Sequence, residues 1–137
     1  MHWRTANHIH AWFVDNVQGG YDNCKFYHVR WELLDVLIGV CDEVLAGSEL
    51  VSGHVYEGFE LSSDGKHWVE HRKPGLVIKD PTTARTLMPY RAGYFFGNCD
   101  YDQWYLGAIT ETRDWAKRMV NDFHSGVPGK IYYRSSW

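Results

Sequence analysis

The chain has 137 residues with 45% hydrophobic and 23% charged, a composition typical of one folded domain rather than of a disordered chain. The net charge of −3 and the lack of a lysine or arginine run argue against general nucleic-acid binding, and the three cysteines form no CxxC pair for a zinc ribbon. No segment resembles a signal peptide or a membrane span, so we expect a cytoplasmic protein with no membrane contact.

The first predicted element is a helix over residues 5 to 17, which Thr5 would cap and Gly19-Gly20 would end. One face of this helix carries a mixed set of side chains, with spacings of four, four and three residues: Arg4, His8, Trp12 and Asp15. We consider two interpretations equally. The face contacts a ligand, or Trp12 packs on a neighbouring element while the charged side chains are solvated.

A short strand over residues 25 to 29 and a helix over residues 30 to 46 follow. The helix has an apolar stripe that includes Cys41, which we therefore expect to be a core residue rather than a reactive thiol. We predict that this helix is part of the scaffold.

Residues 51 to 80 are predicted to form an inserted β-meander, more polar than the rest of the chain. Ser62-Ser-Asp-Gly65 and Pro74-Gly75 would supply two turns. His67-Trp-Val-Glu-His71 has the spacing of a zinc-peptidase motif, but on a strand its histidines would lie roughly 13 Å apart, too far for one metal ion. Asp80-Pro81 then predicts the start of a short helix.

The junction at residues 91 to 105 is the strongest candidate for a site. An aromatic strand, Tyr94–Phe96, runs into Gly97 and then into a polar loop, where we expect Asp100 to cap the next helix. Free backbone N–H groups at this helix start can bind polar ligands. The junction therefore contributes four candidate binding residues: Asn98, Asp100, Asp102 and Trp104.

A long helix is predicted from about Tyr101 to Phe123, and a closing strand over residues 130 to 137, which we place beside Tyr94–Phe96. These elements predict an α+β fold: a single-domain two-layer sandwich whose antiparallel or mixed sheet is packed by three helices. We expect Trp137 to lie near the first helix or the junction, so that both chain ends and the junction form one surface.

No catalytic residue, metal ligand or cofactor is assigned from the sequence. A phosphate-binding glycine loop and a GxSxG elbow are both missing. One histidine, His8 or His10, with Asp100 and Asp102 could hold a divalent metal, but the two carboxylates are more often a helix cap and a complement to the helix dipole.

Three blocks carry a resemblance: residues 3 to 18, residues 93 to 105, and Tyr132-Tyr-Arg-Ser-Ser-Trp137. Together they resemble a family of small proteins encoded by tailed bacteriophages, over about half of the chain. Cys99 departs from the Ser or Thr expected there, and Arg30-Trp31 departs from a capping Ser followed by Arg. The resemblance implies a phage setting in the cytoplasm of a bacterial host and supplies no mechanism.

The leading hypothesis is a non-enzymatic phage accessory protein that inhibits a host defence protein by binding to it. Seven Trp, nine Tyr and six Phe support a recognition surface. One alternative is a sponge for a nucleotide or signalling molecule, with phosphate facing Arg4 or Arg91. Another is a metal-dependent hydrolase or nuclease that uses Asp100, Asp102 and a histidine.

Overall fold

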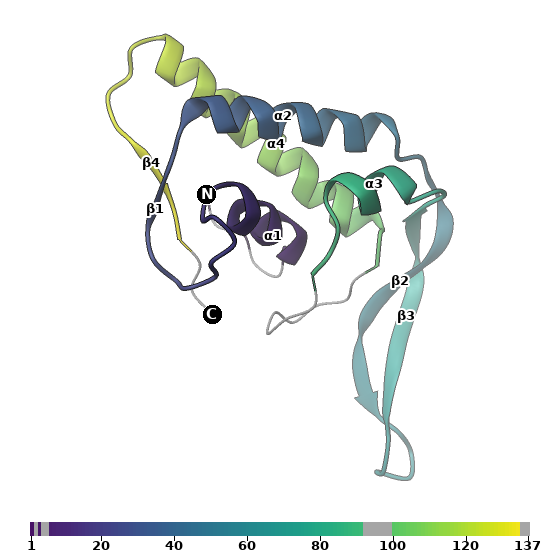
Figure 1. Cartoon of the computed structure of the whole chain (residues 1–137). Coiled ribbons are helices and arrows are strands. Elements are labelled where there is room, and N and C mark those ends of the chain that lie inside the picture. The colour runs from purple at the N-terminus through teal and green to yellow at the C-terminus, as the bar shows by residue number, and fades with distance from the viewer. Residues whose placement is uncertain (2, 4–5, 92–99, 135–137) are drawn as a thin grey trace.

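The computed structural model describes residues 1, 3, 6–91 and 100–134 of the chain. In chain order the elements are α1 (Asn7–Asn16), β1 (Tyr27–Val29), α2 (Trp31–Ala46), β2 (Leu50–Leu61), β3 (Trp68–Ile78), α3 (Thr82–Leu87), α4 (Gln103–His124) and β4 (Ile131–Tyr133) (Figure 1). This mixture of helices and antiparallel strands confirms the α+β class. In the described part of the chain, no helix has the length and apolar character that crossing a membrane requires.

The core lies between the helices. α2 and α4 pack on each other, and α1 and α3 lie against this pair (Figure 1). The apolar stripe predicted for the second helix is confirmed by the complete burial of Leu34, Leu37, Cys41 and Val44. α4 contributes Tyr105, Ile109, Thr112 and Ala116 to the same core, as its helical spacing predicts.

Cys41 should be chemically silent while the protein is folded. Its side chain is fully buried, and this burial raises the pKa of its thiol to about 12, so almost no reactive thiolate exists at neutral pH. In a Cys24→Ser/Cys99→Ser variant, we expect Ellman's reagent to label Cys41 only after denaturant is added. Rapid labelling of the native variant would contradict the core assignment.

Among the described residues, the strands form two separate antiparallel pairs, whereas the sequence predicted a single sheet. β4 pairs with β1, with Tyr133 opposite Tyr27 and Ile131 opposite Val29. The predicted partner of the closing strand, Tyr94–Phe96, lies outside the described residues.

β2 and β3 form one long hairpin that extends away from the helices (Figure 1). The turn predicted at residues 62 to 65 is confirmed, and Gly65 there has the left-handed φ of 69°. The second predicted turn is wrong: Pro74 and Gly75 lie inside β3, opposite His54 and Gly53. Both strands of a two-stranded hairpin are edge strands, where proline is tolerated, so the strand continues through Pro74.

The starts of the helices differ slightly from expectation, and α4 begins at Gln103 rather than at about Tyr101. α1 begins at Asn7, after Ala6, and the expected cap Thr5 lies outside the described residues. α3 begins at Thr82, one residue later than predicted. The Asp80 carboxylate nevertheless accepts hydrogen bonds from the Thr82 backbone N–H (3.1 Å) and hydroxyl (2.6 Å), so it stabilises the helix start as expected.

Candidate functional site

The predicted binding face of the first helix is mostly part of the core. Trp12 is buried, which favours the packing interpretation. Asp15 is half exposed and forms an ion pair with Arg91. Arg4 lies outside the described residues. Because Arg91 is already paired with a carboxylate, its guanidinium is less suited to the phosphate contact that the sequence suggested.

His8 is the most deeply buried member of this face, with 2% of its surface exposed. Its ring stacks on Tyr105, with 4.3 Å between ring centroids, and meets Tyr90 edge to face at 4.9 Å. Burial lowers the pKa of His8 to about 3, so the imidazole is neutral at physiological pH. His8 is thus packed in the core, and it also lines a cavity of about 150 Å³ together with Trp12, Asp15 and Arg91.

At the junction, the expected roles of the two aspartates are reversed. Asp102, not Asp100, caps α4: its Oδ1 accepts hydrogen bonds from the backbone N–H groups of Trp104 (2.9 Å) and Tyr105 (3.2 Å). Asp100 instead forms an ion pair with Arg72 of β3 at 2.7 Å. The extended backbone of Asp102 is the reason for the exchange, since an N-cap residue needs a non-helical conformation directly before the first turn.

This arrangement leaves little room for the predicted ligands at the junction. The Asp102 carboxylate already occupies N–H groups at the helix start that an anion would need. Within residues 1, 3, 6–91 and 100–134, no cluster of three His, Cys, Asp or Glu side chains could hold a metal ion. Asn98 and Trp137 lie outside the described residues, so their predicted roles stay predictions.

The junction anchors the hairpin to the helical body. The backbone N–H of Ile78 donates to the Tyr101 carbonyl (3.0 Å), and that of Leu76 donates to Gln103 Oε1 (2.8 Å). The Asp100–Arg72 ion pair adds a third connection further along β3. These contacts hold the base of the hairpin, so the described part of the junction, from Asp100 on, is a structural joint.

Replacing Asp102 with Ala should lower the free energy of unfolding by about 1 kcal/mol, because the first turn of α4 loses its cap. Asp102→Asn is the matched control: it keeps a side-chain oxygen that can accept the same bonds, and we expect it to lose much less stability. Urea denaturation followed by circular dichroism measures both. Equal losses in the two variants would show that the carboxylate charge, not the cap, matters at this position.

The first of two candidate binding surfaces is at the far end of the hairpin. Phe59, Leu61 and Trp68, here called the tip cluster, are 61%, 49% and 72% exposed. Leu61 is paired with Trp68 across the strands, and Phe59 lies two residues from Leu61, so the pleat places all three on one face. All residues from 63 to 74 are exposed, although Arg72 among them is paired with Asp100 of the junction.

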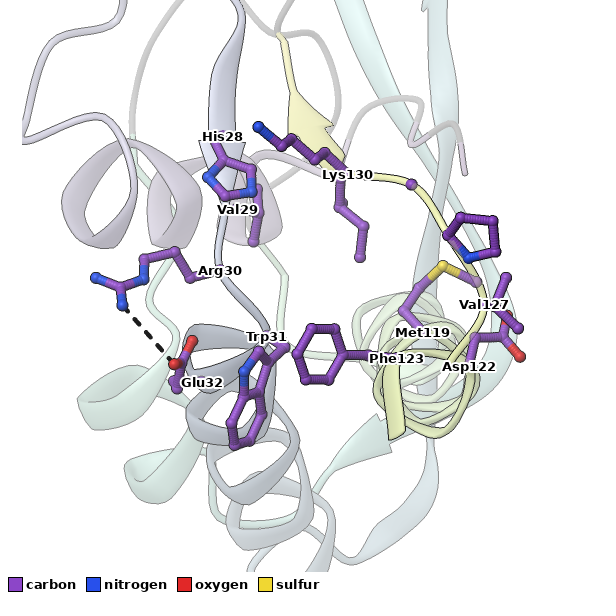
Figure 2. A pocket seen from close by; sticks show the side chains of 13 residues that line it. His28, Val29, Arg30, Trp31, Glu32, Met119, Asp122, Phe123, Val127 and Lys130 are labelled. Atoms are coloured by element: carbon purple, nitrogen blue, oxygen red, sulfur yellow. Dashed lines mark ion pairs between the residues drawn. The ribbon is translucent and has the colours of Figure 1, made fainter. Parts of the chain in front are cut away.

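The second is a cavity of about 550 Å³ between the start of α2, the end of α4 and the β1–β4 pair (Figure 2). Trp31 and Phe123 stack against each other in its wall, with 5.3 Å between ring centroids. The sequence predicted Phe123 on the inner stripe of the long helix, but it is 51% exposed. Phe123 faces Trp31 and the cavity, whereas Met119 and Val120, about one turn earlier in α4, pack against the core.

Sequence reasoning missed both surfaces. The apolar residues on either side of the turn at residues 62 to 65 were a signal for the tip cluster, because a hairpin brings such residues together. The cavity had no comparable signal, since its walls come from segments about 90 residues apart.

Comparisons with known proteins do not assign the chain to a family: no family model, curated protein or solved structure matches it. Arguments about function therefore rest on the two surfaces and on the sequence.

Proposed function

We propose that this protein is a non-enzymatic accessory protein of a tailed bacteriophage, that it binds and inhibits a defence protein of the bacterial host, and that the tip cluster is its main contact. One observation carries the binding part of this proposal: three large apolar side chains are exposed together on an arm that extends from the body (Figure 1). The phage setting rests on the resemblance of the three sequence blocks.

A partner at the tip cluster would also stabilise the arm itself. A two-stranded hairpin is only marginally stable in water unless something packs on its face. The junction holds the base of this hairpin and Arg72 is paired with Asp100, but the side chains of the tip cluster stay largely exposed. A protein partner that covered the tip cluster would remove three large side chains from water and stabilise the outer hairpin at the same time.

The composition of the arm also suits a protein partner. A tryptophan at the centre of a small apolar patch is a typical hot spot of protein–protein interfaces. The Arg72–Glu70 ion pair, at 3.1 Å, lies beside it on the same face, because Glu70 is paired with Phe59 across the strands. An apolar centre with a mixed polar rim is the usual anatomy of such an interface.

The test uses two tryptophan variants, Trp68→Ser in the tip cluster and Trp104→Ser at the start of α4, where the side chain is 56% exposed. Tagged wild-type protein captures partners from bacterial lysate, and the captured protein is identified, purified and titrated against all three chains. We expect Trp68→Ser to weaken binding by about 30-fold and Trp104→Ser to change it little.

Two results would contradict the proposal. Either no protein is captured specifically, or Trp68→Ser binds the purified partner as tightly as the wild type does. A larger loss of affinity with Trp104→Ser than with Trp68→Ser would instead place the binding site at the junction. Both substitutions are at exposed positions, so thermal unfolding should confirm that the folded body is intact.

A further inference from the structure

The cavity beside α2 has the size and lining of a small-molecule site, and it is separate from the tip cluster. Its volume of about 550 Å³ falls within the range of roughly 300–1,000 Å³ that is typical of ligand pockets. Its apolar lining comes from Val29, Trp31, Met119, Phe123, Val127, Pro128 and Ile131. These side chains form a largely apolar interior with two aromatic rings.

Basic groups lie at one end of this interior. His28 of β1 and Lys130, directly before β4, lie beside each other on the strand side of the cavity (Figure 2). Both are exposed. The acidic lining residues are placed differently: Glu32 is directed to Arg30, at 3.8 Å, and Asp122 lies on the opposite side near Val127 (Figure 2). Lys130 therefore places a positive charge at the end of the cavity beside the His28 ring.

The start of α2 also contributes to the uneven distribution of charge around the cavity. Trp31 and Glu32, its first two residues, line the cavity, and no described side chain forms a capping hydrogen bond at Arg30. The 16-residue helix thus brings the positive end of its dipole to the cavity wall, where Glu32 is the acidic residue of the first turn. α4 differs, because Asp102 caps its start.

We propose that this cavity binds a planar aromatic anion of the size of a nucleoside monophosphate. The base lies against Trp31 and Phe123, where stacking is tolerant of base identity. The phosphate lies at the end formed by His28 and Lys130, near the start of α2. This inference does not depend on the proposed protein partner, because the tip cluster contributes no residue to the cavity.

Isothermal titration calorimetry with AMP, GMP, CMP and UMP tests the proposal, with adenosine and inorganic phosphate as partial ligands. We expect at least one nucleotide to bind with a Kd below about 1 mM, and each partial ligand to bind at least about tenfold more weakly. Lys130→Gln should weaken nucleotide binding by about tenfold and leave adenosine unchanged. Phe123→Ala should weaken both.

Lys117→Gln is the matched charge control, since Lys117 is exposed on α4 and does not line the cavity. It should bind nucleotide as the wild type does. The proposal is overturned if none of the four nucleotides binds at about 10 mM, or if Lys130→Gln and Lys117→Gln have the same effect. Equal affinity for adenosine and AMP would also overturn it, because the anion would then have no role.

Discussion

Lowering the pH from 7 to 4 should reduce the free energy of unfolding by about 3 kcal/mol through His8 alone. The fold holds the pKa of His8 at about 3, whereas the ordinary value is 6.5, so the folded state favours the neutral ring. The full stabilisation of the folded state by the neutral His8 ring is present above pH 6.5, and it is lost progressively as the pH falls toward 3. Burial against Tyr105 and Tyr90 is the physical cause.

Urea denaturation at pH 7, 5.5 and 4 measures this effect. A His8→Gln variant should be less stable than the wild type at pH 7, with a clearly smaller loss on acidification. His67→Gln, at an exposed position of the hairpin turn, is the control and should follow the wild type. Hydrogen bonds lower the pKa of the exposed Asp64 and Asp80 carboxyls. What these two groups contribute to the free energy of unfolding is therefore lost only below about pH 4. An unchanged pH dependence in His8→Gln would contradict the assignment.

Phe13→Ala should lower the free energy of unfolding by about 3–5 kcal/mol, the range for removing a buried aromatic ring. Phe13 is fully buried and stacks face to face on Tyr133 of β4, with ring centroids 4.2 Å apart and an angle of 3° between the planes. It also contacts the rings of Trp3 and Trp12. Its loss would open the contact between the first helix and the last strand.

Phe26→Ala is the matched control, because Phe26 is 67% exposed, and its effect should stay below about 1 kcal/mol. Denaturant unfolding followed by tryptophan fluorescence and circular dichroism measures both variants. If Phe13→Ala were as mild as Phe26→Ala, the stacking of Phe13 on Tyr133 would not be part of the folded core in solution.

A second contact between the same segments shows why such clusters are invisible in the sequence. His10 Nδ1 lies 2.5 Å from the Tyr133 hydroxyl, and its Nε2 lies 3.0 Å from an oxygen of Asp22. Burial raises the pKa of Tyr133, so the phenol stays protonated and donates to His10 rather than acting as a nucleophile. The three residues join α1, the following loop and β4, and no local spacing connects them.

The sequence by itself determined the local elements whose signals are short-range. The apolar spacing of residues 33 to 45 predicted α2 almost to the residue, and the turn at residues 62 to 65 predicted the hairpin. Cys41 was correctly assigned to the core. Helical periodicity and turn residues act over a few positions, so one segment contains all the information that these features need.

Only the tertiary structure decided how these elements meet. The pairing of β4 with β1 joins segments about 100 residues apart, and the short strands carry no signal for their partner. Asp102 rather than Asp100 directly precedes the first turn of α4, and Asp100 instead pairs with Arg72 of the hairpin. The burial of His8 depends on Tyr90 and Tyr105. Each of these features depends on contacts between distant segments, and such contacts stabilise the protein only once the chain has folded.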